Sequence, residues 1–149
     1  AHQGLREYQA PVEYGRSEII RKGKKIAVLG VGSMIPSCME ICKGLKDDGY
    51  DPTFVNARFV KPLDVDLLDE LAKDHSLFVT VEENVKSGGY GEHVSAYMEA
   101  CHPEIRVLSA AVWDRFVPQG NVESLRSRIG LGVEDIRQAI EDSEELREQ

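Results

Sequence analysis

The sequence has no long apolar run and only a few cysteines and aromatic residues. No stretch approaches the roughly 18 consecutive apolar residues of a membrane-spanning helix, so we expect no membrane span. Three cysteines, an odd number, argue against a disulfide framework and favour a reducing compartment, with the cytoplasm as the expected location. The first residues lack the regions of a secretory signal, and there is no initiating Met, so we expect a fragment or a processed product.

The charge balance is acidic. Lys and Arg number 18 against 26 Asp and Glu, which gives a formal net charge of −8. Phosphate backbones repel a chain of this sign, so we expect no nucleic-acid partner. The length of 149 residues suits a single domain that buries roughly two-thirds of its unfolded surface in one core.

The chain divides into a lead-in and one domain. Residues 1–23 show no sustained apolar periodicity and contain three glycines and a proline. Such a composition is typical of an extended segment rather than of a helix or a strand. We therefore expect an interdomain linker over 1–23 and a folded domain over 24–149.

Strand and helix patterns alternate through this domain. Short apolar runs predict strands at 25–30, 53–57, 77–81 and 105–108. Apolar residues at helical spacing predict a first helix that has Pro36 near its start and ends before Gly49. Further helices are predicted at 65–73 with Asp64 as N-cap, at 93–101, at about 121–128, and in a last segment marked by Val133, Ile136, Ala139 and Ile140. This alternation predicts an α/β fold, a three-layer sandwich with a mostly parallel sheet.

The turn at residues 30–33 follows the first strand and precedes the first helix, where open α/β sheets bind phosphate. The third glycine of a dinucleotide-binding G-x-G-x-x-G motif is replaced by Ile35, and residues 56–58 include no acid for a ribose hydroxyl. A tight strand-to-helix turn is therefore favoured. A free-standing module that binds a phosphorylated metabolite through this turn is the alternative.

Two carboxylates and an amide follow the third strand at Glu82, Glu83 and Asn84, and a glycine-rich run lies at 88–91. The carboxyl ends of strands are where such folds place functional groups. Adjacent side chains of an extended segment point in opposite directions, so Glu82 and Glu83 need not form an acid/base pair. Capping, loop anchoring or contact with a neighbouring domain is favoured over catalysis, with a stand-alone enzyme using Glu82 or Glu83 as the alternative.

Other reactive residue types have structural interpretations. Cys38 and Cys42 share a helical face, but no second pair completes a metal site, so buried free thiols are favoured. His75 and His93 have no nucleophile nearby in sequence, which favours a surface or interface role. The apolar and charged mixture at 113–118 suits either a buried interface or a loop lid.

Several segments together resemble a known family. Residues 54–64 read FVNARFVKPLD, residues 79–84 read VTVEEN, and residues 114–120 read DRFVPQG. In order and spacing these segments resemble the C-terminal domain of 1-deoxy-D-xylulose-5-phosphate synthases, over about residues 15–140. Transketolases and the beta subunits of 2-oxo acid dehydrogenase decarboxylases carry a looser version of the pattern and are the alternatives.

The resemblance implies a fold like the transketolase C-terminal domain and a cytoplasmic, homodimeric enzyme with N-terminal and middle domains in the same chain. It implies a transferase that uses thiamine diphosphate and magnesium to join pyruvate and D-glyceraldehyde 3-phosphate, with release of carbon dioxide. The product would serve isoprenoid, thiamine and pyridoxal biosynthesis.

The segments that would hold the cofactor and the catalytic groups in that family have no counterpart here. No catalytic, cofactor-binding or metal-binding residue is therefore assigned to this chain, and we expect it to be inactive alone and to bind no thiamine diphosphate. Its expected role is to pack on the neighbouring domains and support the dimer. The expected contact residues are Arg58, Glu82, Glu83, Asn84, Asp114 and Phe116.

Overall fold

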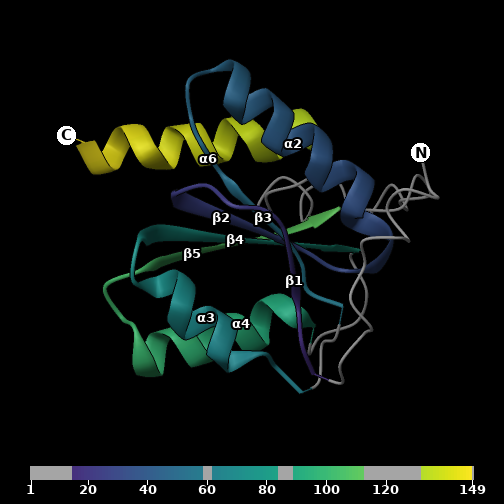
Figure 1. Ribbon diagram of the computed structural model, residues 1–149. Helices are drawn as coiled ribbons and strands as arrows, with labels where there is room; N and C mark the ends of the chain where they lie inside the picture. Colours follow the sequence, from purple (N-terminus) through teal and green to yellow (C-terminus); the bar gives the residue numbers. More distant parts are fainter. Residues whose placement is uncertain (1–14, 59–61, 84–88, 113–131, 149) are drawn as a thin grey trace, which may run out of the picture.

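A computed structural model describes residues 15–58, 62–83, 89–112 and 132–148 (Figure 1). Its centre is a five-stranded sheet in the order β1-β3-β2-β4-β5. The strands are β1 (Glu18–Arg21), β2 (Lys25–Gly30), β3 (Thr53–Asn56), β4 (His75–Glu83) and β5 (Arg106–Val112). Strands β2 to β5 run parallel, whereas β1 pairs with β3 in the antiparallel sense.

Helices cover both faces of this sheet (Figure 1). A 3-10 turn, η1 (Gly32–Met34), leads into α2 (Ile35–Asp47), which lies with α6 (Val133–Glu148) on one face. Helices α3 (Val65–Ala72) and α4 (Tyr90–Cys101) lie on the other. The expected three-layer α/β sandwich with a mostly parallel sheet is confirmed.

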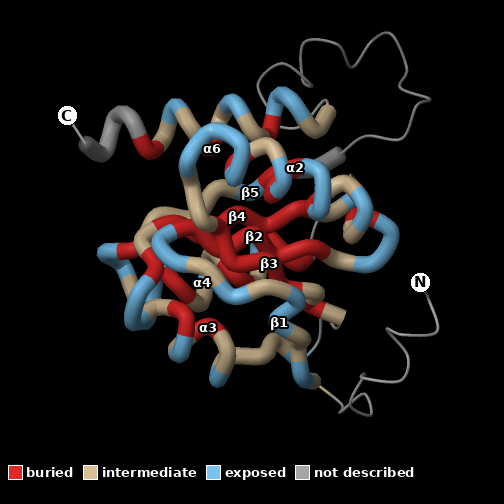
Figure 2. Tube along the Cα trace, turned by 45° about the horizontal axis from the view of Figure 1, so that its top comes forward, coloured by how far each residue is buried: buried red, intermediate tan, exposed pale blue. Residues whose placement is uncertain are grey.

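The central strands are buried on both sides, as Figure 2 shows for β2 and β4. Val28 and Val79 pack beneath α2 and α6, whereas Leu29 and Phe78 pack beneath α3 and α4. All four side chains are fully buried. A continuous apolar run in a parallel strand reflects this two-sided burial.

Most predicted elements have the expected kind and place. The strand at 25–30 is confirmed, and the Asp64 carboxylate caps α3 by accepting a 3.2 Å hydrogen bond from the Leu67 N–H. Helix α4 starts at Tyr90, three residues before the predicted start, so it takes in the end of the glycine-rich run. The helix expected at 121–128 lies outside the described residues.

One strand lies inside the segment predicted to be a lead-in. Strand β1 adds to the free edge of β3, pairing Ile19 with Val55. Its approach is fixed by Ser17, whose N–H donates to the Asp64 carboxylate at 2.7 Å and whose hydroxyl donates to the Ala57 carbonyl at 2.9 Å. Residues 18–21 are therefore part of the sheet, while the interdomain role of 1–23 stays a prediction.

The expected surface or interface role of His75 is wrong, because its side chain is fully buried at the start of β4. Its Nε2 lies 2.7 Å from the Thr53 hydroxyl, and its Nδ1 lies 2.8 Å from the Leu71 carbonyl oxygen. The Thr53 hydroxyl also accepts a hydrogen bond from the Gly23 N–H at 2.8 Å. His75 is thus a structural residue that joins β4 to β3 and α3.

Candidate functional site

The candidate site is the edge of the sheet where the parallel strands end. Arg58 follows β3, the turn at 30–33 follows β2, and Glu82 and Glu83 end β4. The chain passes from β2 through α2 to β3 on one side of β2, and then from β3 through α3, on the opposite face, to β4 on the other side of β2. Such a topological switch point is where open α/β sheets place their functional groups.

Glu82 holds the start of α4. Its Oε1 accepts a 2.9 Å hydrogen bond from the Tyr90 N–H, and its Oε2 accepts one of 2.7 Å from the Gly91 N–H. The carboxylate thereby satisfies two of the unpaired donors of the first helical turn and opposes the positive end of the helix dipole. Capping was one of the three structural roles expected for this segment, and Glu82 has it.

The glycines around Tyr90 allow this close approach. A Cβ atom on Gly89 would lie 2.1 Å from Oε1 of Glu82, and one on Gly91 would lie 2.8 Å from Oε2. Both distances are too short for real Cβ contacts, so any larger residue would displace the carboxylate. The glycine-rich run therefore serves the packing of α4 against the end of β4.

Glu83 points the other way, as alternation along a strand requires. Its Oε1 accepts a 2.7 Å hydrogen bond from the Ser33 hydroxyl, in the turn that precedes α2. Both side chains are exposed. The two neighbouring carboxylates thus contact different elements, and the bonds they make are those of anchoring groups rather than of an acid/base pair.

The turn at 30–33 has the compact geometry expected from the sequence. Gly32 has a positive φ of 56°, which favours glycine, and η1 begins there. Gly30 packs so closely that an added Cβ would lie 2.6 Å from Sγ of Cys38 in α2. The tight strand-to-helix turn is confirmed.

Arg58 is held at the end of β3 by the edge strand. Its Nη2 lies 2.5 Å from Oε1 of Glu18 in β1, and its backbone N–H donates to the Asn56 side chain at 3.0 Å. The backbone has a φ of 61°, so Asn56 supports a conformation that costs energy for a residue with a Cβ. The Arg58 side chain is mostly buried, at 15% exposure, and its role as a contact group stays a prediction.

Two buried polar atoms near this edge have no hydrogen-bond partner among the described residues: Oγ1 of Thr80 and Nε2 of His93. The Thr80 hydroxyl lies 2.8 Å from where a Cβ on Gly91 would be, close to the Glu82 carboxylate. Beside them, burial, then the charges of Asp64 and Glu82, raise the pKa of Tyr90. The expected surface or interface role of His93 stays a prediction.

The structure places Arg58, Glu82 and Glu83 at one edge of the sheet, whereas Asn84, Asp114 and Phe116 lie outside the described residues. Sequence reasoning missed Ser33 as the partner of Glu83 and Tyr90 as a partner of Glu82. The glycine run beside Tyr90 was the signal for a close backbone approach. Nothing in the sequence signals the Ser33 contact.

The described residues offer little for a metal or a nucleophile. They contain no group of three His, Cys, Asp or Glu side chains placed to hold a metal ion. Cys38 and Cys42 are buried free thiols, as expected, and burial raises the pKa of each to about 12. Cys101 is also free but exposed. None of the described helices is long and apolar enough to cross a membrane.

Comparison with known sequences gives a consistent match. A family model described as "Transketolase, C-terminal domain" matches residues 15–136. The chain is 39% identical over 137 residues to a 1-deoxy-D-xylulose-5-phosphate synthase of Lachnoclostridium phytofermentans, covering 91% of this chain and 22% of that protein. The synthase of Dictyoglomus thermophilum is also 39% identical over 137 residues, with 92% and 22% covered. The chain therefore spans about a fifth of the length of these relatives.

Solved structures give the same fold. A structure titled "Split gene transketolase, inactive beta4 tetramer" superposes with a TM-score of 0.71 at 30% identity, covering 88% of this chain and 43% of that one. The transketolase of Campylobacter jejuni superposes with a TM-score of 0.54 at 17% identity, covering 86% and 18%. At that identity the second likeness concerns the fold alone.

Proposed function

Because the chain belongs to the transketolase C-terminal domain family, we propose that it is the C-terminal domain of a 1-deoxy-D-xylulose-5-phosphate synthase. The longer enzyme would join a two-carbon unit of pyruvate to D-glyceraldehyde 3-phosphate, with loss of the pyruvate carboxyl group as carbon dioxide. The observation that supports this choice is the 39% identity over 137 residues to proteins of that name. Transketolase is the second candidate, favoured by the structural match at 30% identity.

The residues of the carboxyl edge would contribute contacts rather than chemistry. Both oxygens of Glu82 are engaged by backbone N–H groups of α4, and Glu83 is engaged by Ser33. Arg58 is oriented by Glu18, and its side chain is 15% exposed. A rigid edge with preset charges is suited to docking against another domain, because little side-chain freedom is lost on contact.

We assign the docking role to this edge, with Arg58, Glu82, Glu83, Asn84, Asp114 and Phe116 as its contact residues. The partners would be the N-terminal and middle domains of the same chain and the second subunit of a homodimer. The exposed Ser33 hydroxyl, paired with Glu83, belongs to the same surface. The described members of this surface lie at the ends of β2, β3 and β4.

Thiamine diphosphate and magnesium are implied for the longer enzyme by the names of the relatives. The described residues do not fit them. They contain no cluster of three candidate metal ligands, and the Glu82 carboxylate is already engaged by two N–H donors. No step of the reaction is therefore assigned to a residue described here, and the cofactor would be held by other parts of the enzyme.

The deciding experiment measures carbon dioxide release from labelled pyruvate with D-glyceraldehyde 3-phosphate and thiamine diphosphate. We expect activity from the gene's full-length product and none from the 149-residue chain or from the full-length product without residues 15–149. A longer enzyme that instead transfers two-carbon units between sugar phosphates, without carbon dioxide, would be a transketolase. Activity of the 149-residue chain alone would contradict the supporting role.

Variants of the full-length product test the docking edge. Arg58→Gln removes the charge and shortens the side chain but keeps an unbranched side chain with a polar end. We expect a weaker dimer and a lower activity, measured by sedimentation and by carbon dioxide release. Lys73→Gln is the matched control, because Lys73 is 73% exposed at the end of α3, away from the carboxyl edge. Equal effects of the two variants would contradict the assignment.

A further inference from the structure

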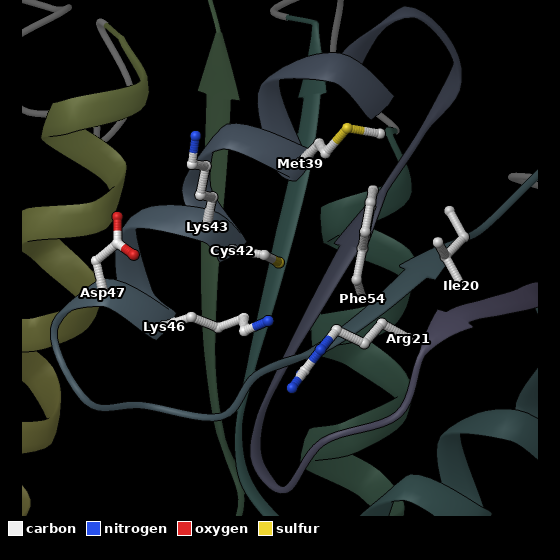
Figure 3. Close-up of a pocket in the computed structure, with 8 residues that line it drawn as sticks. All are labelled: Ile20, Arg21, Met39, Cys42, Lys43, Lys46, Asp47 and Phe54. Carbon is white, nitrogen blue, oxygen red and sulfur yellow. The ribbon is translucent and has the colours of Figure 1, made fainter. Parts of the chain in front are cut away.

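A pocket of about 450 Å³ lies between the edge strand β1, the start of β3 and helix α2 (Figure 3). Phe54 lies near the beginning of β3, and Lys46 and Asp47 end α2, so the pocket is distant from the carboxyl edge of the sheet. Its size falls in the range of small-molecule sites, roughly 300–1,000 Å³. None of its residues takes part in the contacts of the candidate site.

One part of the pocket is apolar. Phe54 and Cys42 are buried, at 4% and 5% exposure, while Ile20 and Met39 are 44% and 57% exposed. Among the described residues, three large apolar side chains are at least 39% exposed: Ile19, Ile20 and Met39. Two of these three, Ile20 and Met39, line the pocket. Apolar surface gathered in one hollow is typical of a ligand site, whereas scattered apolar residues carry no such meaning.

The other part is cationic. Figure 3 shows Arg21 from β1 and Lys46 from α2 directed toward the same end of the pocket, below Phe54. Lys43 and Asp47 also line the pocket, but both are directed away from that end. With Asp51, the ion-pair partner of Arg21, the lining carries three cations against two carboxylates, so the pocket keeps a positive balance although the whole chain has a formal net charge of −8.

Of the two cations at this end of the pocket, Arg21 is paired with a carboxylate of the described residues and Lys46 is not. Arg21 is held by Asp51 at 2.7 Å and by the Pro52 carbonyl oxygen at 2.8 Å, so its guanidinium is preoriented. Lys46 makes no ion pair with any residue that the structure describes. A preoriented guanidinium and an unpaired ammonium at one end of an apolar pocket form a complementary environment for an anionic group.

We propose that this pocket binds a small amphipathic anion, with a hydrocarbon body of several carbons and a phosphate or carboxylate head. The head lies between Arg21 and Lys46, and the body covers Phe54 and contacts Met39 and Ile20. The apolar part supplies affinity through burial, and the cations select for the charged end. This site is independent of the proposed synthase function.

Calorimetric titration of the 149-residue chain tests the site, with hexyl phosphate and hexanoate as probes. Hexanol supplies the body without the charge, and inorganic phosphate supplies the charge without the body. We expect saturable binding of one equivalent of a charged probe, and binding at least about tenfold weaker for hexanol and for phosphate, the ratio that ~1.4 kcal/mol produces. Whichever of hexyl phosphate and hexanoate binds more tightly identifies the head group.

Two exposed positions allow variants that leave the core intact. Lys46→Gln removes the unpaired cation, and Met39→Ser removes an exposed apolar wall. We expect each to weaken binding of the better probe by about fivefold to tenfold, with an unchanged circular dichroism spectrum. Lys73→Gln is the matched lysine control, because α3 lies on the opposite face of the sheet, and it should leave binding unchanged.

Three outcomes would overturn the assignment. Equal affinity for hexanol would mean an apolar crevice without selection for charge. If inorganic phosphate binds as tightly as the charged probes, or if Lys46→Gln leaves probe binding unchanged, the anions associate with surface charges outside the pocket. Concentration-dependent self-association that Met39→Ser abolishes, without probe binding, would mean that a second copy covers the pocket.

Discussion

The Ser33 hydroxyl donates a 2.7 Å hydrogen bond to Oε1 of Glu83, which links the turn after β2 to the end of β4. The neighbouring Glu82 carboxylate points the opposite way and accepts two backbone hydrogen bonds from the start of α4. Adjacent carboxylates at one strand end thereby fix the two segments that flank the switch point of the sheet. Glu82 is less exposed than Glu83, so we expect its hydrogen bonds to contribute more to the free energy of unfolding.

Replacing Glu82 with Ala should destabilise the domain. The change removes both acceptors of the Tyr90 and Gly91 N–H groups, so we expect a loss of about 1–2 kcal/mol, as for other helix caps. Glu83→Ala is the matched control, and we expect less than about 0.5 kcal/mol there, because Glu83 and Ser33 are exposed. Urea unfolding of both variants measures the difference. Equal losses would contradict the capping role of Glu82.

A second prediction concerns the coupling between Gly89 and Glu82. A Cβ at position 89 would lie 2.1 Å from Oε1 of Glu82, so Gly89→Ala should cost about 1–3 kcal/mol by displacing the carboxylate. In the Glu82→Ala background that obstacle is gone, and the same change should cost much less. A double-mutant cycle by urea unfolding gives the coupling energy. Additive losses would show that Gly89 is needed for another reason.

The sequence predicted the buried strands because their burial leaves a local mark. The run at 25–30 is apolar without interruption, since β2 packs against helices on both faces. Strand β1 leaves no such mark, because its Ile19 and Ile20 are exposed and its pairing with β3 joins residues more than 30 positions apart. Long-range edge pairing of a four-residue strand is not encoded in local periodicity.

For the candidate site, the sequence predicted where the residues lie but not which residues they contact. Placement of Glu82 and Glu83 at a strand end, and their opposite directions, follow from the strand pattern alone. Their partners do not, because Ser33 is 50 residues from Glu83 in the chain. The burial of His75 was missed for a similar reason: one of its side-chain partners, Thr53, lies 22 residues away and on another strand.

That buried pair supports a third prediction. Thr53→Val keeps the shape of the side chain but removes the hydroxyl, which leaves Nε2 of His75 and the Gly23 N–H without their partner. We expect a loss of about 2–3 kcal/mol, the cost of unpaired buried polar groups. Thr53→Ser keeps the hydroxyl and loses only a methyl group, for about 1 kcal/mol. Thermal unfolding compares them, and a Val variant as stable as the Ser variant would show that the hydrogen bonds contribute nothing.

The fourth prediction concerns acid stability. Oδ1 of Asp69 in α3 lies 2.7 Å from Nε2 of His102 and accepts a 2.7 Å hydrogen bond from the Tyr97 hydroxyl, which joins α3 to α4. The hydrogen bond with His102, and then that with Tyr97, lower the pKa of the Asp69 carboxyl below its ordinary value. The ionised carboxylate therefore stabilises the fold.

The pH at which this stability is lost follows from the sign of the shift. Because the pKa of Asp69 is lower in the folded chain, the unfolded chain takes up the proton first as the pH falls. The contribution of Asp69 is complete above the unfolded-state pKa and is lost progressively below about pH 5. The urea midpoints of the wild type and of Asp69→Asn should differ at pH 7 and converge toward pH 3. Tyr97→Phe should lose only part of the same contribution, because the contact of Asp69 with His102 remains. If the difference between the wild type and Asp69→Asn stays constant from pH 7 to pH 3, the pKa of Asp69 is the same in the folded and the unfolded chain.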